Sequence, residues 1–493
     1  MNSTTALAII GAVIVATTAF GLFGVRKIRM SPQQFIVGGR SFGAVFLWLL
    51  MAGEVYTSFT FLGAAGWAYG KGAPAFYIIC YLTLGCAIGI FVLPFVWRVA
   101  QRHNLLTNAD YFATCYQSRL LGFLTAAVGV VFLIPYITLQ LTGIQILLRI
   151  AGYGSIDTTL AAGLAFALIV VFVLFGGLRG AAWASLVKDG LVLAAVMFAG
   201  IVLPTQFFGS PQNAIDQVLK LKPNWMTLVP GAGEFGTIWF VSTILLTGCG
   251  AFMWPHSIAA AYSAKSEESL RRNLAGLPFY QIMLLLMYFA GFSALILKPG
   301  LKGQEVDQSF MIVVQEHYSA SVLGIIAGAG CLAALIPAAT QILAAASLIS
   351  KNILSVGVVR TGEGGQTLLT RCLIVGVALL AFGLWVFQKS TLVGLLLIAY
   401  SGITQLFPGV LFSLMRRRPS ALSVSFGIVV GIGLLIVFAV KGVTVLGGLN
   451  VGFVALLANT AVVLLFWRVG PRIEEDSPGA IAVGGRNATR NLS

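Results

Sequence analysis

The amino-acid sequence predicts an all-α, polytopic membrane protein. Of the 493 residues, 58% are hydrophobic and only 9% are charged, whereas soluble domains carry about 25% charged residues. The apolar runs are long enough to cross a bilayer. They lack the alternation of barrel strands, and backbone groups in lipid must be bonded internally, so the predicted spans are helices. These observations exclude a string of soluble domains.

Apolar runs fill residues 1–467, which we interpret as a single membrane domain. No basic residues precede the first run and no small-residue cleavage site follows it, so we interpret it as a retained helix and not a signal peptide. The tail at 468–493 is charged and then rich in Gly, Ser and Asn, a composition typical of disorder. Thirteen spans are predicted, at 5–24, 43–69, 75–97, 119–148, 158–177, 183–207, 235–261, 275–297, 319–350, 371–388, 391–415, 420–440 and 448–467.

The net charge of +15 is compatible with a nucleic-acid partner, but the positions of the basic residues favour another interpretation. With the N-terminus outside and the C-terminus in the cytoplasm, most of the 30 Lys and Arg residues fall on inward-facing segments. This distribution follows the positive-inside rule. The basic residues therefore orient the bundle in the membrane, and no nucleic-acid partner is predicted.

Glu54 lies in the middle of the apolar run 43–69. A carboxylate at the centre of a bilayer costs at least about 2.5–3.5 kcal/mol, so such a residue is usually functional. A structural hydrogen bond between helices is the alternative. The same run also holds glycines and hydroxyl side chains that suit an unwound, oxygen-lined segment: Gly53, Gly63, Gly66, Thr57, Ser58 and Thr60.

The run 235–261 resembles the run 43–69 in kind. It contains the sequence TGCGAFMWPH, in which Pro255 cannot donate a helical hydrogen bond. Two interrupted helices in matching positions are the expected mark of inverted repeats around a midplane site. The sequence therefore predicts core repeats at about 43–207 and 235–415, with extra helices at 5–24, 420–440 and 448–467.

Six segments in order resemble the sodium:solute symporter family. The resemblance implies thirteen helices with a LeuT-like 5+5 inverted repeat, and alternating access for a small solute. The segments are FIVGGRSFG (35–43), FTFLGAAGWAYGKG (59–72), GGLRGAAW (176–183), PHSIAAAYSAKSEESLRR (255–272), AALIPAATQILAAASLISKN (333–352) and LFPGVLFSLMRRRPS (406–420).

The chain departs from the sodium-coupled members of that family. Where they carry an adjacent pair of hydroxyl residues in the ninth helix, this chain has Pro337 and Ala338. Where they carry an aspartate in the sixth helix, it has Ser185, and Ala260 replaces an arginine. Sodium is a hard cation that prefers several oxygen ligands. These departures from the family pattern disfavour sodium coupling, so transport is predicted to be proton-coupled or sodium-independent.

Lys188 provides a replacement for the ion. Its ammonium is expected to reach the carbonyls of the unwound segment near Glu54, and the readily shifted pKa of a buried lysine suits proton coupling. Snorkelling to the inner surface is the alternative. Adjacent helical side chains diverge by about 100°, so Asp189 is expected to point elsewhere. The predicted coupling residues are Glu54, Lys188, Ser185 and Ala338.

The predicted substrate-binding residues are those expected to lie around an unwound segment at the middle of the membrane. Each also has a plain structural alternative, such as packing or interhelical hydrogen bonding. They are Glu54, Thr57, Ser58, Tyr136, Gln140, Phe252 and Trp254.

The pairing of the run EVYT at 54–57 with LIPA at 335–338 resembles bacterial monocarboxylate permeases, which implies a short acid such as lactate, pyruvate or acetate. An amino acid or other small solute carried with sodium is the alternative. A channel or a transporter-like sensor is the alternative of another class. No enzyme activity is predicted, because no catalytic cluster appears by spacing. No cofactor is predicted, and no metal is predicted because the Cys and His residues show no metal spacing. The coupling ion is predicted to be H⁺, with Na⁺ left open, and the oligomeric state is not predicted.

Overall fold

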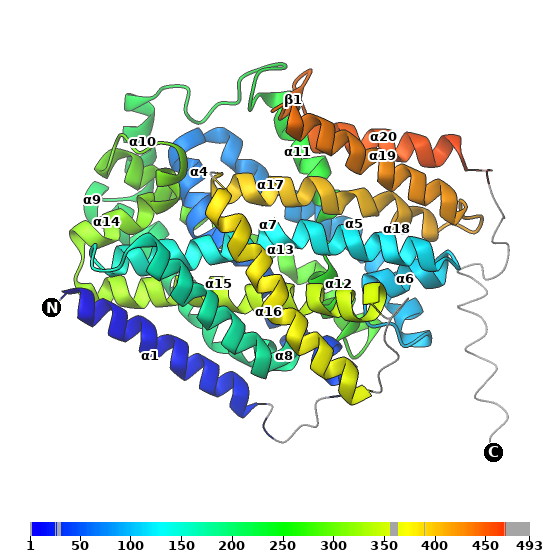
Figure 1. Ribbon diagram of the computed structural model, residues 1–493. Helices are drawn as coiled ribbons and strands as arrows, with labels where there is room; N and C mark the ends of the chain where they lie inside the picture. The colour runs from blue at the N-terminus through cyan, green and yellow to red at the C-terminus, as the bar shows by residue number, and fades with distance from the viewer. Residues whose placement is uncertain are drawn as a thin grey trace.

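The computed structural model describes residues 2–24, 26, 31–354, 363–388, 390–467 and 469. Helices make up almost all of the described chain (Figure 1). A short antiparallel ladder joins β1 (Val445–Leu446) to β2 (Leu449–Asn450). The predicted all-α class is confirmed. Except for Val469, the predicted tail at 468–493 lies outside the described residues.

The first half of the chain contributes α1 (Asn2–Phe23), α2 (Pro32–Val37), η1 (Gly38–Arg40), α3 (Ala44–Val55), η2 (Phe59–Gly63), α4 (Ala64–Lys71), η3 (Ala73–Phe76), α5 (Tyr77–Arg102), α6 (Asn108–Cys115), α7 (Arg119–Ala151), α8 (Thr158–Met197), η4 (Phe198–Val202), α9 (Leu203–Phe208) and α10 (Pro211–Leu221). The second half contributes α11 (Thr237–Gly250), α12 (Pro255–Tyr262), α13 (Glu267–Leu297), η5 (Gly303–Gln308), α14 (Ser309–His317), α15 (Ala320–Leu348), η6 (Ile349–Leu354), α16 (Glu363–Phe387), α17 (Leu392–Ile403), η7 (Thr404–Leu406), α18 (Phe407–Ser413), α19 (Ala421–Val440) and α20 (Val451–Leu465).

Short polar side chains begin several of the long helices. Ser118, Asp157, Ser266 and Ser319 each accept a hydrogen bond from the backbone N–H three residues further on. This satisfies one of the free N–H groups at a helix start. The long helices run from left to right in Figure 1, with α10 and α14 at one end and α6 and α18 at the other. The charge distribution predicts that the α10 end faces outward, and we call it the outer end.

Both predicted interruptions are present. The pair α3 and η2–α4 bends by 53°, and the pair α11 and α12 bends by 46°. At the first bend Tyr56 is extended, and the hydroxyl of Thr57 accepts the N–H of Phe59 at 3.1 Å. At the second bend Trp254 is extended and Pro255 begins the next helix. At the first bend a side chain thus replaces part of the lost helical bonding, as a break inside a membrane requires.

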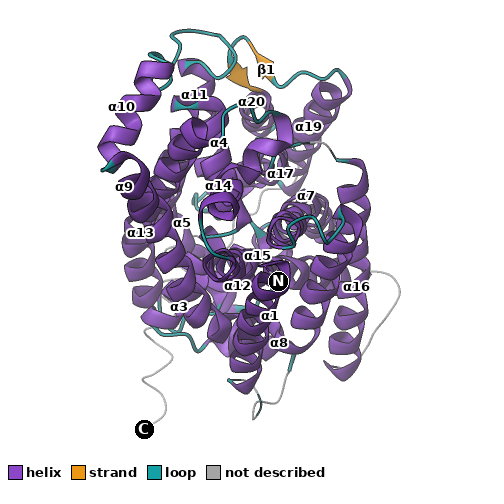
Figure 2. Cartoon of the chain, turned by 90° about the vertical axis from the view of Figure 1, so that its left-hand side faces the viewer, coloured by secondary structure: helices purple, strands orange, loops and turns teal. Residues whose placement is uncertain are grey.

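Helix α15 runs through the middle of the bundle, with α1, α7 and α8 packed around it (Figure 2). Almost all of its residues are buried, and most are small, including the run Ala344, Ala345 and Ala346. Small side chains let helix backbones approach closely in a membrane. The centre of the molecule is therefore a tightly packed region against which the bent pairs pack.

The number of spans depends on how breaks are counted. Among the described residues, nine helices are long and apolar enough to cross a membrane, or eleven if each bent pair is one span. The segment Thr158–Phe208 holds two of the predicted spans, and its helix is broken at Gly177, whose positive φ of 54° favours glycine. Val451–Leu465 is apolar but has only 15 residues. The count of thirteen and the inverted repeat remain predictions.

A loop at the outer end is fastened to the first bent pair. The indole of Trp225 donates to Ala68 O at 3.1 Å, and its carbonyl accepts from Ala73 N at 2.8 Å. Gly72 is left-handed there, with φ of 68°, and a Cβ would overlap the carbonyl of Trp225. The preceding helix α10 packs on α13, and its residues Ala214 and Val218 are buried.

Candidate functional site

Four of the predicted substrate-binding residues lie together. Glu54, Tyr136, Phe252 and Trp254 line a cavity of about 30 Å³, which is bounded by α3, α7 and the break between α11 and α12. We call it the central cavity. A volume of this size holds roughly two water molecules. In this conformation the site is therefore closed around a space smaller than an organic solute.

Aromatic rings form much of the wall of the central cavity. The ring centroids of Tyr136 and Trp254 are 4.9 Å apart, and those of Trp254 and Tyr400 are 5.1 Å apart. Tyr81 lies 5.5 Å from Tyr400, and His256 lies 5.7 Å from Tyr136. Such edge-to-face packing is favourable and directional. The wall can close on the apolar body of a small solute.

Three polar atoms of residues that line the central cavity have no partner among the described residues. They are Glu54 Oε1, Trp254 Nε1 and His256 Nδ1, and all three residues are buried. The hydroxyl of Thr340, from α15, lies beside the carboxyl group of Glu54. A buried polar group without a partner costs about 1–3 kcal/mol, so these atoms are ready to bond water or a solute.

The remaining predicted binding residues support the first bend. Gln140 Oε1 accepts hydrogen bonds from Ser58 Oγ at 2.7 Å and from Ser58 N at 3.3 Å. Thr57 lies next to Tyr136. Ser58 and Gln140 are not part of the central cavity's wall. The structure therefore brings Gln140 to the backbone that the bend leaves free, and α7 holds that bend in place.

Lys188 is fully buried and contacts the first bent pair. Its Nζ donates to Gly53 O at 2.6 Å and lies 3.0 Å from Asp189 Oδ1. A Cβ on Gly53 would lie 2.7 Å from Nζ and 3.1 Å from Ser185 Oγ, so only glycine leaves room for this contact. Lys188 thus joins α8 to the segment just before Glu54.

The expectation that Lys188 and Asp189 point to different places is wrong. The four-carbon stem of lysine bends back far enough for its ammonium to reach the neighbouring carboxylate. The hydroxyl of Tyr280, from α13, faces the same carboxylate. A buried ammonium therefore has a buried counter-charge, which lowers its desolvation cost.

The other two predicted coupling residues supply little to an ion. Ser185 Oγ donates to Ala181 O at 3.0 Å, within its own helix. Ala338 is fully buried in α15 and has no side-chain oxygen, and the hydroxyl of Thr340 donates to Pro337 O. In the described part of the chain, no group of three His, Cys, Asp or Glu side chains could hold a metal ion.

A polar cluster lies at the end of the bundle opposite the outer end (Figure 1). Asp110, in a capping box with Thr107, accepts from Lys351 Nζ at 2.5 Å and from Asn352 Nδ2 at 2.8 Å. Burial alone would raise the pKa of Asp110, but the ammonium of Lys351 and these hydrogen bonds outweigh it and lower the pKa. The cluster ties α6 to η6.

Sequence reasoning did not select Tyr81 and Tyr400 as site residues. Both line the central cavity. Tyr400 begins the run YSGITQ, whose glycine and polar residues at mid-span resemble the signals of the two bent pairs. This run could have identified Tyr400 as a site residue from the sequence. Tyr81 is one of several aromatic residues on α5 and has no distinguishing neighbour.

The sequence model of the sodium:solute symporter family matches residues 35–431. The uncharacterized symporter YhjB of Bacillus subtilis is 39% identical over 470 residues, covering 93% of this chain and 96% of that one. A monocarboxylate transport permease protein of Rhizobium johnstonii is 28% identical over 356 residues, covering 71% of this chain and 70% of that one.

The fold is similar to that of a Na⁺-coupled sialic acid symporter solved in a substrate-bound, outward-open state. The TM-score is 0.79 at 14% identity, covering 95% of this chain and 99% of that one. At this identity the likeness shows the LeuT-like symporter fold alone. Family and fold are those of transporters and not of enzymes, and bacterial members with many apolar helices are multi-pass inner membrane proteins. The chain belongs to the sodium:solute symporter family.

Proposed function

We propose that this protein takes up a short monocarboxylate by alternating access, with H⁺ and not Na⁺ as the coupling ion. The observation that carries the coupling is the contact of Lys188 Nζ with Gly53 O at 2.6 Å. A carbonyl at the break of a membrane helix is a typical ligand for a coupling ion. Here an ammonium group takes that position.

A fixed ammonium disfavours sodium at the same carbonyl. Two unit charges about 4 Å apart repel by about 4 kcal/mol at an effective dielectric constant of 20. The neighbouring positions add no compensating oxygen, because Ala338 has none and Ser185 Oγ donates within its helix. The positive charge of Lys188 thus replaces that of a bound cation.

Protonation of Lys188 would control how firmly α8 holds the first bent pair. An ammonium makes a charge-assisted hydrogen bond to Gly53 O, and a neutral amine makes a weaker one. Loss of the proton also leaves Asp189 without its counter-charge at 3.0 Å. Glu54, one residue from Gly53 and unpartnered at Oε1, is the second candidate proton carrier.

The monocarboxylate part of the proposal rests on similarity to the Rhizobium permease and on the site's small, aromatic-walled volume. The second candidate is a sodium-coupled symporter of an amino acid or another small solute, which the likeness to a Na⁺-coupled symporter favours. A channel or a sensor would share the fold without coupled, saturable flux.

The experiment is counterflow and gradient-driven uptake by the full chain in proteoliposomes. The labelled solutes are lactate, pyruvate, acetate and proline, in sodium-free buffer with an inward proton gradient. We expect saturable uptake of a monocarboxylate that a protonophore abolishes, and loss of accumulation in Lys188→Met. Strict dependence on Na⁺ overturns the proton coupling. Ohmic current or binding without flux overturns the carrier.

A further inference from the structure

The polar groups of the central cavity differ in what they can bond. Glu54 carries the only carboxylate among the described residues that line it. An ionised carboxylate only accepts hydrogen bonds, whereas the indole N–H of Trp254 only donates. Both side chains are buried, and neither Glu54 Oε1 nor Trp254 Nε1 has a partner among the described residues. The cavity therefore offers a solute one fixed acceptor and one fixed donor.

The rest of the wall does not meet the need of Glu54 for a donor. The other polar side chains of the wall both donate and accept, so they adapt to either kind of group: Tyr81, Tyr136, His256, Ser257 and Tyr400. The hydroxyl of Thr340, beside the carboxyl group, gives its one hydrogen to Pro337 O at 2.9 Å. The hydrogen that Glu54 lacks must therefore come from water or from the solute.

The helix ends at the two bends act in the same sense. Glu54 lies one residue before the end of α3, where the helix dipole is negative, and Trp254 precedes the start of α12, where it is positive. No side chain caps α12, and its first backbone N–H groups belong to His256 and Ser257, which line the cavity. A matching solute directs an anionic group to α12 and a donor to α3.

The charge of Glu54 sets a further condition. The ammonium of Lys188 acts on Glu54, but it is already paired with Asp189 at 3.0 Å. A carboxylate solute therefore brings a second negative charge close to Glu54. A 2-amino acid balances that charge with its own ammonium group, and a 2-hydroxy acid is balanced by the proton that accompanies it.

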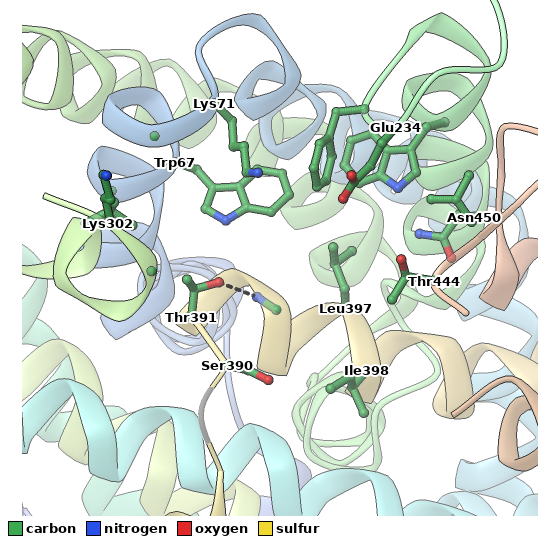
Figure 3. A pocket seen from close by; sticks show the side chains of 18 of the residues that line it. Trp67, Lys71, Glu234, Lys302, Ser390, Thr391, Leu397, Ile398, Thr444 and Asn450 are labelled. Carbon is green, nitrogen blue, oxygen red and sulfur yellow. Dashed lines mark hydrogen bonds between the residues drawn. The ribbon is translucent and has the colours of Figure 1, made fainter. Parts of the chain in front are cut away.

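The outer end of the molecule is less selective. A cavity of about 610 Å³ lies there between α4, α11, η5, α17 and the β1–β2 hairpin, and we call it the outer cavity. Its wall carries both signs of charge, on Lys71, Lys302 and Glu234 (Figure 3). A volume of this size suits a ligand much larger than a short acid. Because the two cavities share no lining residue, the choice between similar short acids falls to the central cavity.

We infer that Glu54 is the specificity-determining residue of the central cavity, and that it selects short acids with a hydrogen-bond donor on the carbon next to the carboxylate. These are 2-hydroxy and 2-amino monocarboxylates. Glu54 accepts from the hydroxyl or ammonium group, while Trp254 and the start of α12 donate to the carboxylate. The carboxylate part rests on the proposed function, whereas the need for a donor comes from Glu54 alone.

The test is equilibrium binding of lactate, alanine, pyruvate and propionate to the full chain in lipid nanodiscs. These acids have the same carbon skeleton and differ at the carbon next to the carboxylate, which bears a hydroxyl, an ammonium, a keto oxygen or only hydrogen. We expect lactate or alanine to bind more tightly than pyruvate and propionate by about tenfold or more, because an acid without a donor leaves Glu54 unpaired. The tighter of the two identifies the donor as hydroxyl or ammonium.

Two variants of Glu54 check the assignment. Glu54→Gln keeps the size of the side chain but adds an amide N–H that can bond a keto oxygen, so it should narrow the difference between lactate and pyruvate. Glu54→Met removes the acceptor and should remove the preference for lactate over propionate. Glu268→Gln makes the same change at an exposed carboxylate outside the central cavity, and it should leave the order of affinities unchanged.

The outcomes separate this inference from the proposed function. Equal affinity for lactate, alanine and propionate, or an unchanged preference in Glu54→Gln, overturns the role of Glu54 and leaves uptake of monocarboxylates standing. A Glu54-dependent preference in binding without saturable uptake supports the role of Glu54 and overturns the carrier. If none of the acids binds to the unaltered chain, the inferred solute class is wrong.

Discussion

Replacing Lys188 by methionine removes the charge of a buried ion pair and keeps the length of the side chain. The Nζ–Oδ1 distance of 3.0 Å to Asp189 corresponds to an attraction of about 5–6 kcal/mol at an effective dielectric constant of 20. Removing one partner of a buried pair typically costs about 3–5 kcal/mol, because the other charge stays buried. We expect Lys188→Met to lower the free energy of unfolding by that amount.

The double variant Lys188→Met with Asp189→Asn removes both charges, so we expect it to recover at least half of the loss. The assay is thermal unfolding followed with a thiol-reactive dye, because Cys86, Cys115 and Cys331 are buried in the folded chain. Asp189→Asn alone is the control for the effect of the amide substitution on stability. Purely additive losses in the double variant, or wild-type stability of Lys188→Met, would refute the ion pair as the source of the effect.

Three further changes test other parts of the molecule. Gly53→Ala should abolish uptake with normal membrane expression, because the added Cβ would lie 2.7 Å from Lys188 Nζ; uptake near the wild-type level would contradict the close contact. Burial raises the pKa of Asp307, in η5, from 3.8 to about 7. The folded state therefore holds this proton more tightly, and stability falls as pH rises between those values. Part of this loss is already present at pH 5, so Asp307→Asn should raise the melting temperature more at pH 8 than at pH 5; equal shifts at both pH values would contradict the assignment. The pKa of Asp110 is shifted in the opposite direction, because Lys351 and hydrogen bonds overcome the effect of burial and lower it. Its contribution is present above the ordinary pKa and lost as pH falls through the lowered one, so Asp110→Asn should cost about 1–3 kcal/mol at pH 7 and less at acid pH.

The sequence predicts the two bent pairs well because their causes are local. Pro255 removes a helical donor, and the glycines and hydroxyls around Glu54 favour an unwound segment. The break at Gly177 was likewise placed at the boundary between two predicted spans. Composition and charge were sufficient for the membrane class.

The rest of the central cavity's wall could not be predicted, because it depends on how distant helices cross. Tyr81 and Tyr400 are 319 positions apart in the numbering, and only the packing of α5 and α17 against α11 brings their ring centroids to 5.5 Å. The ion pair of Lys188 with Asp189 was missed for another reason. Helical geometry fixes the direction of the Cβ atoms, but a flexible lysine stem can cancel that divergence.

The attachment of Trp225 to the first bent pair has a mechanical consequence. Its two hydrogen bonds, to Ala68 O and from Ala73 N, join the loop that follows α10 to the end of α4. Because α10 packs on α13, the loop links the end of α4 to α13 through α10. Any outward swing of α4 must either carry this loop along or break both hydrogen bonds.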